Sequence, residues 1–558
     1  MDLQYSNVKQ LWYNQEPQFL RKLKYIDLSH SLQLTETPDF WYLPNLEKLL
    51  LINCKKLVLV HKTIRILNRK LVLLNFKGCT ELRDLPVELY TLKSLETLIL
   101  SGCSQLERLD DALGGLESLT TLKADFTALR KIPSSSNQLK KLKELSLDGC
   151  KDLWKDRDFT RSDESPQESL PTTLSLTGLT CLVTLSLGSC NLSDELIPED
   201  LGSLSCLEEL SLQGNNFRNL QTDFAGLWSL QILKLDSCSE LESMFSLPKK
   251  LRSFYASNCI MLERTPDLSG CLGLQSLHLT NCFNLVETPG LDTLKRVGVI
   301  HMEMCKRISD TYRERIMQRW AVDGNGGIFV PGSSLPNWVS FKNEKHSISF
   351  TVPKSLNPDL VGFTLWTPYV SQQNDMLSAY SSRITLKNQT NGDIWSLNPA
   401  TDHIRMYREK HIWQGHFSND EYNLQTGDQV EVSVDFGDQI AILETGLCLA
   451  YREEDTDSSD SDTSEVGHDE IIDEQLILRE AGGDDEELVM EETQSRPRRK
   501  MGMGLKTLVG AFGLLTMTVI AVLGKRNILL SRQNRLRSIE GGKNEKDVRL
   551  KFFSRQGF

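Results

Sequence analysis

The chain has 558 residues, of which 39% are hydrophobic and 25% charged, and its formal net charge is −12. This length is too great for one compact core, although a repeat solenoid can extend that far as a single unit. Residues 1–18 contain no apolar run of the length that a secretory signal peptide needs, so we do not expect the protein to be secreted.

A nine-residue frame, L-x-x-L-x-L-x-x-C/N/T/S, recurs twelve times between residues 23 and 305. Its closing residues lie 21 to 25 positions apart, except for one gap of 40. This frame and this period are typical of leucine-rich repeats, whose stacked units bury their leucines in a continuous core. We therefore predict an α/β leucine-rich-repeat solenoid for residues 1–308, a horseshoe of about 12 units with parallel strands on its concave face.

Nine of the thirteen cysteines close a repeat. These are Cys54, Cys79, Cys103, Cys150, Cys190, Cys238, Cys259, Cys282 and Cys305. Repetition of one residue type at one position of the frame indicates a ladder of buried thiols, not a disulfide framework, and favours a reducing compartment. We expect the closing side chain to bond backbone groups that the turn leaves unpaired.

The ends of the array and its one long gap carry separate predictions. Leu3, Val8 and Leu11 resemble the remnant of a further repeat, so we expect Met1 to lie inside a longer array. Residues 151–169, within the long gap, are rich in charge and serine and are predicted to form an exposed loop. Residues 309–327 are predicted to form a capping helix, with an apolar face at helical spacing, followed by a glycine-rich hinge.

Residues 328–452 are predicted to form an all-β domain of the sandwich or jelly-roll type. The prediction rests on alternating apolar segments separated by turn sequences such as Asn391-Gly392 and Gly427-Asp428. The segments are residues 347–352, 361–366, 383–387, 429–436 and 447–451.

The last part of the chain divides by charge. Residues 452–492 carry 18 acidic and two basic side chains, a balance of −16, whereas residues 496–558 carry 15 basic and three acidic ones, a balance of +12. We predict a disordered linker at 453–504, a candidate transmembrane helix at 505–524 and a basic tail at 525–558. The uncharged stretch 507–523 would span about 25 Å as a helix, the lower limit for a membrane crossing. Basic residues flank both of its ends, which leaves the orientation open, and an interfacial helix or an unfolded tail are the alternatives.

The sequence carries no complete catalytic or cofactor-binding motif, and we expect neither enzyme activity nor a cofactor. Residues 502–507 (GMGLKT) lack the glycines that a phosphate-binding loop requires. His278 and His301 occupy the same strand position in adjacent repeats, with Glu303 nearby, and could approach one metal ion. Without a third firm ligand, polar side chains on a solvated face are the favoured interpretation.

The outward-facing positions of the predicted strands are the candidate site, because the concave surfaces of solenoids are binding surfaces. Their mixed charge disfavours nucleic acid, which would require a basic stripe. The candidate protein-binding residues are Lys48, Lys77, Lys123, Asp125, Glu144, Asp148, Glu209, Gln213, Lys234, Asp236, Tyr255, His278, His301 and Glu303.

Three groups of motifs resemble plant intracellular immune receptors of the TIR–NB–LRR class. The first is residues 6–12 (SNVKQLW) with 26–31 (IDLSHS) and 34–40 (LTETPDF), and the second is the cysteine ladder with residues 100–103 (LSGC). The third, residues 329–338 (FVPGSSLPNW) with 361–363 (VGF), is similar to the start of that family's post-LRR β-sandwich domain, the C-JID. The resemblance covers residues 1–452, and this chain contains no TIR or nucleotide-binding region.

The resemblance implies a protein-recognition module of plant innate immunity that senses a pathogen effector or a guarded host protein. A TIR/NB-containing receptor acting in trans would be a further partner. We expect the cytoplasmic side as the location, with the stretch 507–523 as a potential single C-terminal anchor, although such a span is unusual for that family. Two alternatives remain open. One is a membrane-anchored receptor-like LRR protein, which the sequons at Asn191 and Asn388 would suit. The other is an LRR scaffold that regulates another receptor.

Overall fold

The computed structural model describes residues 1–11, 20–154, 176–220, 224–294, 297–323, 326–353, 360–371, 379–380, 383–397, 404–405 and 407–451. The predicted linker, candidate membrane segment 507–523 and basic tail lie outside these residues, as does most of the predicted 151–169 loop. Within the described part of the chain, no helix has the length and apolar character that a membrane crossing requires.

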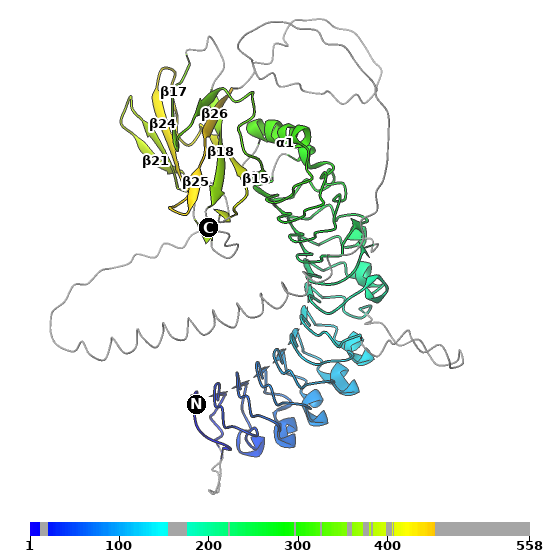
Figure 1. Ribbon diagram of the computed structural model, residues 1–558. Coiled ribbons are helices and arrows are strands. Elements are labelled where there is room, and N and C mark those ends of the chain that lie inside the picture. The colour runs from blue at the N-terminus through cyan, green and yellow to red at the C-terminus, as the bar shows by residue number, and fades with distance from the viewer. Residues whose placement is uncertain are drawn as a thin grey trace, which may run out of the picture. The chain divides into compact units, whose positions relative to one another are not determined.

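Each repeat contributes one three-residue strand to a parallel sheet, which confirms the predicted leucine-rich-repeat architecture (Figure 1). The strands are β1 (Tyr25–Asp27), β2 (Lys48–Leu50), β3 (Leu73–Asn75), β4 (Thr97–Ile99), β5 (Thr121–Lys123), β6 (Glu144–Ser146), β7 (Thr184–Ser186), β8 (Glu209–Ser211), β10 (Ile232–Lys234), β12 (Ser253–Tyr255), β13 (Ser276–His278) and β14 (Val299–His301). A second, two-stranded sheet joins β9 (Asn219–Leu220) to β11 (Ser243–Met244).

The 40-residue gap does not interrupt the sheet. Strand β6 pairs directly with β7, with Leu145 opposite Leu185, in the register that the other neighbours keep. At the other end, a parallel bridge joins Asp2 to Asp27, and the amide of Leu3 donates to the carbonyl of Asp27 at 2.8 Å. The first residues therefore add a further rung to the sheet.

Short 3-10 helices return the chain from one strand to the next on the side of the array opposite the strands (Figure 1). They are η1 (Phe40–Tyr42), η2 (Lys62–Leu67), η3 (Val87–Thr91), η4 (Asp111–Gly115), η5 (Ser134–Gln138), η6 (Asp194–Leu196), η7 (Leu201–Ser203), η8 (Phe224–Gly226) and η9 (Leu291–Thr293). Several begin at a capping residue, such as Asp110, whose carboxylate accepts from the amide of Ala112 at 2.8 Å.

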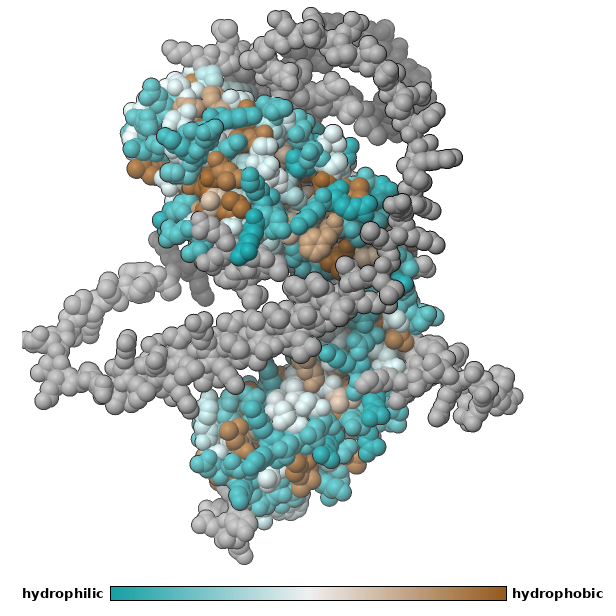
Figure 2. All heavy atoms as spheres, in the orientation of Figure 1, coloured by the Kyte–Doolittle hydropathy of each residue, from teal (hydrophilic) through white to brown (hydrophobic). Residues whose placement is uncertain are grey.

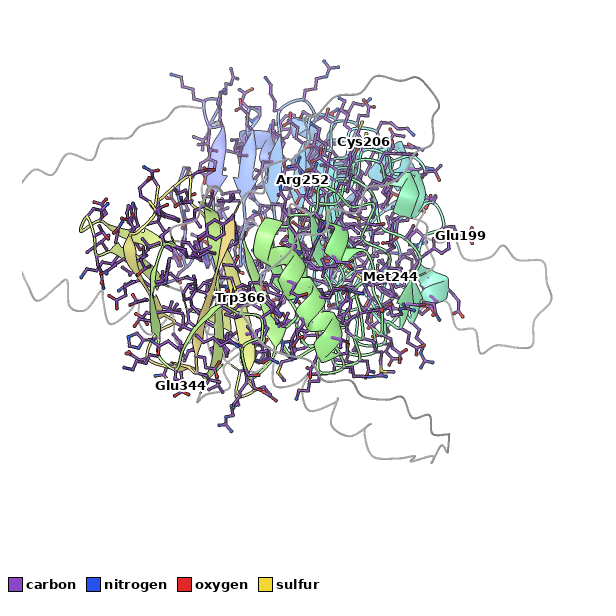
Figure 3. All side chains as sticks on the ribbon, turned by 90° about the horizontal axis from the view of Figure 1, so that it is seen from above. Glu199, Cys206, Met244, Arg252, Glu344 and Trp366 are labelled. Atoms are coloured by element: carbon purple, nitrogen blue, oxygen red, sulfur yellow. The ribbon has the colours of Figure 1, made fainter. Side chains whose placement is uncertain are left out.

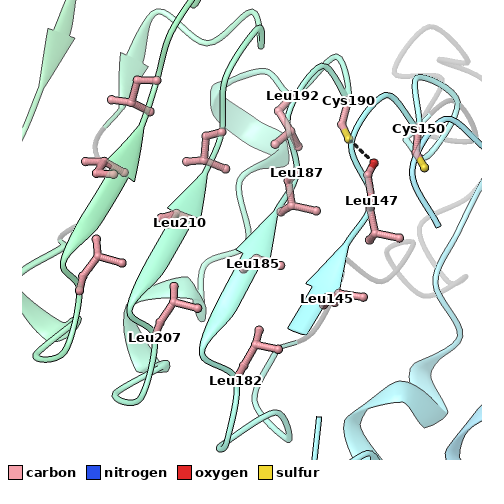
Figure 4. Close-up of a cluster of buried hydrophobic side chains, with 14 of the residues drawn as sticks. Leu145, Leu147, Cys150, Leu182, Leu185, Leu187, Cys190, Leu192, Leu207 and Leu210 are labelled. Carbon is pink, nitrogen blue, oxygen red and sulfur yellow. Dashed lines mark hydrogen bonds between the residues drawn. The ribbon is translucent and has the colours of Figure 1, made fainter. Parts of the chain in front are cut away.

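The leucines of the frame fill the interior between strands and helices, and the ladder cysteines are buried with them (Figure 4). The Sγ of each ladder cysteine donates to a backbone carbonyl oxygen of the preceding repeat at 3.1–3.3 Å. Figure 4 shows one such bond, from Cys190 to the carbonyl of Leu147. The closing cysteine therefore satisfies an acceptor at the turn, and all thirteen cysteines of the chain are free thiols.

Helix α1 (Asp310–Asp323) follows the last repeat. The hydroxyl of Ser309 accepts from the amide of Tyr312 at 3.2 Å and caps the helix start. Ile316 and Trp320 are buried against the end of the repeat core. Two residues of the predicted hinge, 324 and 325, lie outside the described part of the chain.

A β domain follows the helix. Its strands are β15 (Gly327–Pro331), β16 (Phe341–Asn343), β17 (Ser347–Thr351), β18 (Leu360–Ser371), β19 (Ala379–Tyr380), β20 (Arg383–Asn388), β21 (Ile394–Leu397), β22 (Ile404–Arg405), β23 (His411–Ser418), β24 (Gln429–Asp435), β25 (Ile440–Ile442) and β26 (Thr445–Tyr451). The five segments expected to be strands fall in β17, β18, β20, β24 and β26.

The β domain continues the sheet of the repeats. Strand β15 pairs in parallel with β14 on one side and antiparallel with β23 on the other, so one sheet passes from the array into the domain. A second sheet, in the order β17-β24-β20-β21, packs on it through a shared core that includes Phe363 and Val432. Trp366 lies beside helix α1 (Figure 3) and belongs to the core cluster of the repeats.

Candidate recognition surface

The outward side chains of the parallel strands β1–β8, β10 and β12–β14, and of the two residues after each of them, form one surface, which we call the strand face. It exists because successive side chains of a strand point to opposite sides. In β5, for example, Leu122 is buried in the repeat core, whereas Thr121 and Lys123 are partly exposed. On the coloured surface visible in Figure 2, hydrophilic residues predominate over the repeats and hydrophobic ones form small separate groups.

Two ion pairs flank the middle of the strand face. Nζ of Lys123 lies 2.6 Å from Oε1 of Glu144, and Nζ of Lys234 lies 2.6 Å from Oε1 of Glu209. Each pair joins neighbouring strands diagonally, because the lysine ends its own strand and the glutamate begins the adjacent strand of the sheet. All four side chains are about one-third exposed. These four predicted residues therefore reach solvent, but as two pairs and not as independent charges.

Hydrogen bonds hold two carboxylates in place just after β5 and β6, the strands that carry the first of these pairs. Asp125 accepts from the hydroxyl groups of Ser101 and Ser146 and from the amide of Asp148. Asp148 accepts from the hydroxyl of Ser186 and the amide of Gly188, both at 2.6 Å. Burial raises the pKa of Asp148 more than these bonds lower it, and the neighbouring charge of Asp125 adds to the increase. These side chains are therefore held in a fixed arrangement on the strand face.

The remaining exposed candidates lie on both sides of this middle region. Lys48 and Lys77 are exposed towards the N-terminal end, whereas Gln213, Asp236 and Tyr255 are partly exposed towards the C-terminal end. The structure thus places all five on one continuous sheet, although it does not gather them at one point.

The structure buries the last three candidates, which corrects their assignment to a solvated face. His278, His301 and Glu303 are 6%, 1% and 0% exposed. The two histidine rings belong to a stack that runs across four strands from Tyr255 through His278 and His301 to Phe329 of β15, with ring centroids 4.5–5.0 Å apart. Strand β15 extends the sheet past β14, so the β domain covers the outward side chains of the last repeat strand.

Glu303 is the most deeply buried charge of this group. Its Oε1 lies 2.9 Å from Nδ1 of His301, and its Oε2 accepts from the hydroxyl of Thr280 at 3.1 Å. Burial alone would raise the pKa of Glu303, but attraction and a hydrogen bond from His301 outweigh it and lower the pKa to about 2. Nearby, Nε2 of His411 accepts from the amide of Met304 at 3.2 Å, and burial lowers the pKa of His411.

These buried residues do not assemble a metal site. Across the described ranges, no group of three or more His, Cys, Asp or Glu side chains is arranged to hold a metal ion. His301 and Glu303 form a pair, and His278 stacks on His301 with a centroid distance of 5.0 Å.

One part of the strand face was missed by the sequence analysis, which selected polar residues only. Leu50, Ile52, Leu73 and Ile99 occupy outward positions of β2–β4 and the turn after β2, and they are partly exposed. The signal that could have revealed them is an apolar residue at an alternating position that the repeat frame does not require.

The fold and this surface define a leucine-rich-repeat protein with a β domain joined to its last repeat. Over part of its length the chain is homologous to plant TIR–NB–LRR disease resistance proteins. It is 30% identical over 325 residues to the TMV resistance protein N of Nicotiana glutinosa, a match that covers 46% of this chain and 27% of that protein. It is 34% identical over 200 residues to the disease resistance-like protein DSC1 of Arabidopsis thaliana, covering 35% of this chain and 15% of the relative.

The matches thus span about a quarter or less of these curated relatives. Among solved structures, a leucine-rich-repeat protein of Leptospira interrogans is similar with a TM-score of 0.38 and 22% identity, over 54% of this chain and 83% of that one. No protein-family model matches the chain.

Proposed function

We propose that this chain is a non-enzymatic recognition module of plant innate immunity, which binds a pathogen effector or a guarded host protein. Its homology to plant disease resistance proteins is the observation that carries the proposal. Residues 327–451 would be the post-LRR, C-JID-like part of the module. A TIR/NB-containing receptor acting in trans is a further proposed partner.

The strand face supplies the proposed contact surface. Its polar groups are fixed by bonds across neighbouring strands, as Lys123 is by Glu144 and Asp148 is by Ser186. Because these side chains are already ordered, little of their conformational entropy is lost when a partner binds, which favours affinity. The free thiols of the ladder support a reducing compartment, and we therefore propose the cytoplasmic side as the location.

Charge exchange across an ion pair tests this proposal. The Lys123→Glu variant breaks the pair with Glu144, whereas Lys123→Glu combined with Glu144→Lys restores a pair with the charges exchanged. We expect both variants to lose the proteins that the wild-type chain co-purifies from infected leaf tissue, because the pattern presented to a partner has changed in both. Quantitative mass spectrometry of the recovered proteins is the measurement, and thermal melting verifies that each variant is folded.

A matched control exists on the same repeats. Lys93 and Glu117 form an ion pair of 2.7 Å between adjacent repeats, with both side chains 59% exposed, and neither belongs to the strand face. The exchanged pair Lys93→Glu with Glu117→Lys should recover the same proteins as the wild type. Equal recovery by the strand-face and control variants would contradict the proposal that the strand face binds.

The receptor-like alternative meets an obstacle at its second sequon. Asn388 is 1% exposed, its Nδ2 donates to Asp428 at 2.8 Å, and its Oδ1 accepts from the amide of Thr390 at 2.9 Å. A glycan on Asn388 would require this part of the β domain to open. Asn191, by contrast, is exposed, so glycopeptide analysis at Asn191 tests the alternative directly. A regulatory scaffold would instead form a stable complex in unstressed tissue that does not change on infection.

A further inference from the structure

Four aliphatic side chains form an apolar block on the strand face: Leu50, Ile52, Leu73 and Ile99. In the sheet, Leu50 and Ile99 lie on either side of Asn75, in register across β2, β3 and β4. Their strand neighbours Leu49, Leu74 and Leu98 are fully buried in the repeat core. The block therefore points away from that core and contributes nothing to its packing.

Apolar side chains are buried at one end of the strand face and partly exposed at the other. At the C-terminal end, strand β15 places Phe329 against His301, and the aromatic stack is buried. At β2–β4, no segment of the described chain covers the aliphatic side chains, which remain partly exposed. Removal of apolar surface from water is favourable, so a group of partly exposed aliphatic side chains of this kind is a candidate binding site.

Two lysines define the charge of the partner. Lys48 begins β2 and Lys77 follows β3 by two residues, so they lie at opposite ends of the apolar block. Both are exposed, and within the described residues neither is in an ion pair. Asp27 of β1 is level with Leu50 but only 5% exposed, and its carboxylate accepts from the hydroxyl of Tyr25 and the amide of Ser29. Two exposed positive charges therefore border the apolar block, whereas the carboxylate of Asp27 beside it is buried.

We propose that the block at β2–β4 binds an acidic segment of a partner protein, with an aliphatic or aromatic side chain between two carboxylates. The inference rests on the proposed function and specifies which chemistry that surface selects. Leu50, Leu73 and Ile99 would receive the apolar side chain, and Lys48 and Lys77 would each pair with a carboxylate.

The sheet geometry sets the spacing of this motif. Lys48 is level with Leu73, and Lys77 lies four residues beyond Leu73, which is about 13 Å along the strand direction. An extended segment spans the same distance in four residues and presents every second side chain to one side. The expected pattern is therefore acidic–x–apolar–x–acidic.

Synthetic peptides test the pattern with the purified full-length chain. The probe is a fluorescein-labelled dodecapeptide that contains Glu-Ser-Leu-Ser-Glu, and its matched versions replace both Glu by Gln, or Leu by Ser. We expect the first peptide to bind at least about tenfold more tightly than either matched version in fluorescence anisotropy at low salt. The double variant Lys48→Glu/Lys77→Glu should lose that preference, and Ile99→Thr should weaken binding of the leucine peptide.

The control is Lys55→Glu/Lys70→Glu, which changes the net charge equally at two exposed lysines outside the strand face. It should bind as the wild type does. The inference is overturned if the three peptides bind alike, or if the control variant loses the preference as fully as Lys48→Glu/Lys77→Glu does.

The two proposals fail separately. If the peptides bind alike but the recovery of tissue proteins still depends on Lys123 and Glu144, only the proposed peptide motif is overturned. If the peptide preference is observed but no strand-face variant changes the recovery of tissue proteins, the peptide-binding surface stands and its proposed role in defence is overturned.

Discussion

His301 and Glu303 form a buried pair where the repeat array meets the β domain. Nδ1 of His301 lies 2.9 Å from Oε1 of Glu303, and the side chains are 2% and 0% exposed. A buried ion pair costs desolvation energy that its partners must offset, so loss of one partner leaves an uncompensated polar group in the interior. The pair therefore makes the junction sensitive to the charge of Glu303.

The first prediction concerns Glu303→Gln. We expect it to lower the free energy of unfolding by about 3 kcal/mol, the scale of breaking a buried pair. Guanidinium denaturation followed by tryptophan fluorescence measures the change. Glu263→Gln is the control, because Glu263 is 62% exposed in its ion pair with Arg307. Its effect should remain below about 1 kcal/mol, and equal effects of the two substitutions would contradict the prediction.

The second prediction is the pH dependence of the same substitution. The pKa of Glu303 is about 2 in the folded protein, against 4.5 for an ordinary glutamate. A carboxyl with a lowered folded-state pKa stabilises the fold above its unfolded pKa, and this stabilisation is lost as the pH falls through the folded value. The stability difference between wild type and Glu303→Gln should therefore be full at pH 6 and shrink between pH 4.5 and 2. A stability difference between the two proteins that stays constant with pH would contradict this prediction.

The third prediction concerns the thiols. Burial raises the pKa of Cys54 to about 11 and those of Cys103, Cys190 and Cys238 to about 12, so these groups carry almost no thiolate at neutral pH. Of the thirteen cysteines, Cys181 and Cys206 are exposed. Iodoacetamide at pH 7.5 should label these two in the native protein and all thirteen in denaturant, as mass spectrometry would show. Rapid native labelling of the ladder would contradict its burial.

The fourth prediction concerns Asn215, which closes a repeat in place of cysteine. Its Nδ2 donates to the carbonyls of Leu187 and Leu212 at 2.9 and 2.8 Å, and its Oδ1 accepts from the amides of Cys190 and Leu192. Asn215→Ala leaves three buried backbone groups without partners, because the carbonyl of Leu212 still accepts from Sγ of Cys238, and it should cost about 2–4 kcal/mol.

Two further variants separate the causes of that loss. Asn215→Cys should cost less than Asn215→Ala, because a thiol can donate one of the lost bonds, as the ladder cysteines do. Asn216→Ala alters the exposed neighbour and should leave thermal melting within a degree or two of the wild type. An unchanged melting temperature for Asn215→Ala would show that the turn does not depend on these bonds.

Local pattern determined most of the repeat array. The frame around Leu98 and Leu100 fixes which side chains face the core, because alternation along a strand is a property of the backbone alone. Burial of Cys103 follows from the same frame, since every repeat buries its closing position. The alternation in residues 429–436 likewise located β24 before any packing was known.

Tertiary structure decided what each outward residue does. Lys123 and Glu144 are 21 positions apart in sequence and meet only because β5 and β6 are adjacent in the sheet. His301 has the outward position that Lys123 has, yet it is buried because β15 pairs with β14 and stacks Phe329 on it. Periodicity specifies which side of a strand a residue occupies. What covers that side depends on contacts with distant residues, which the local sequence does not encode.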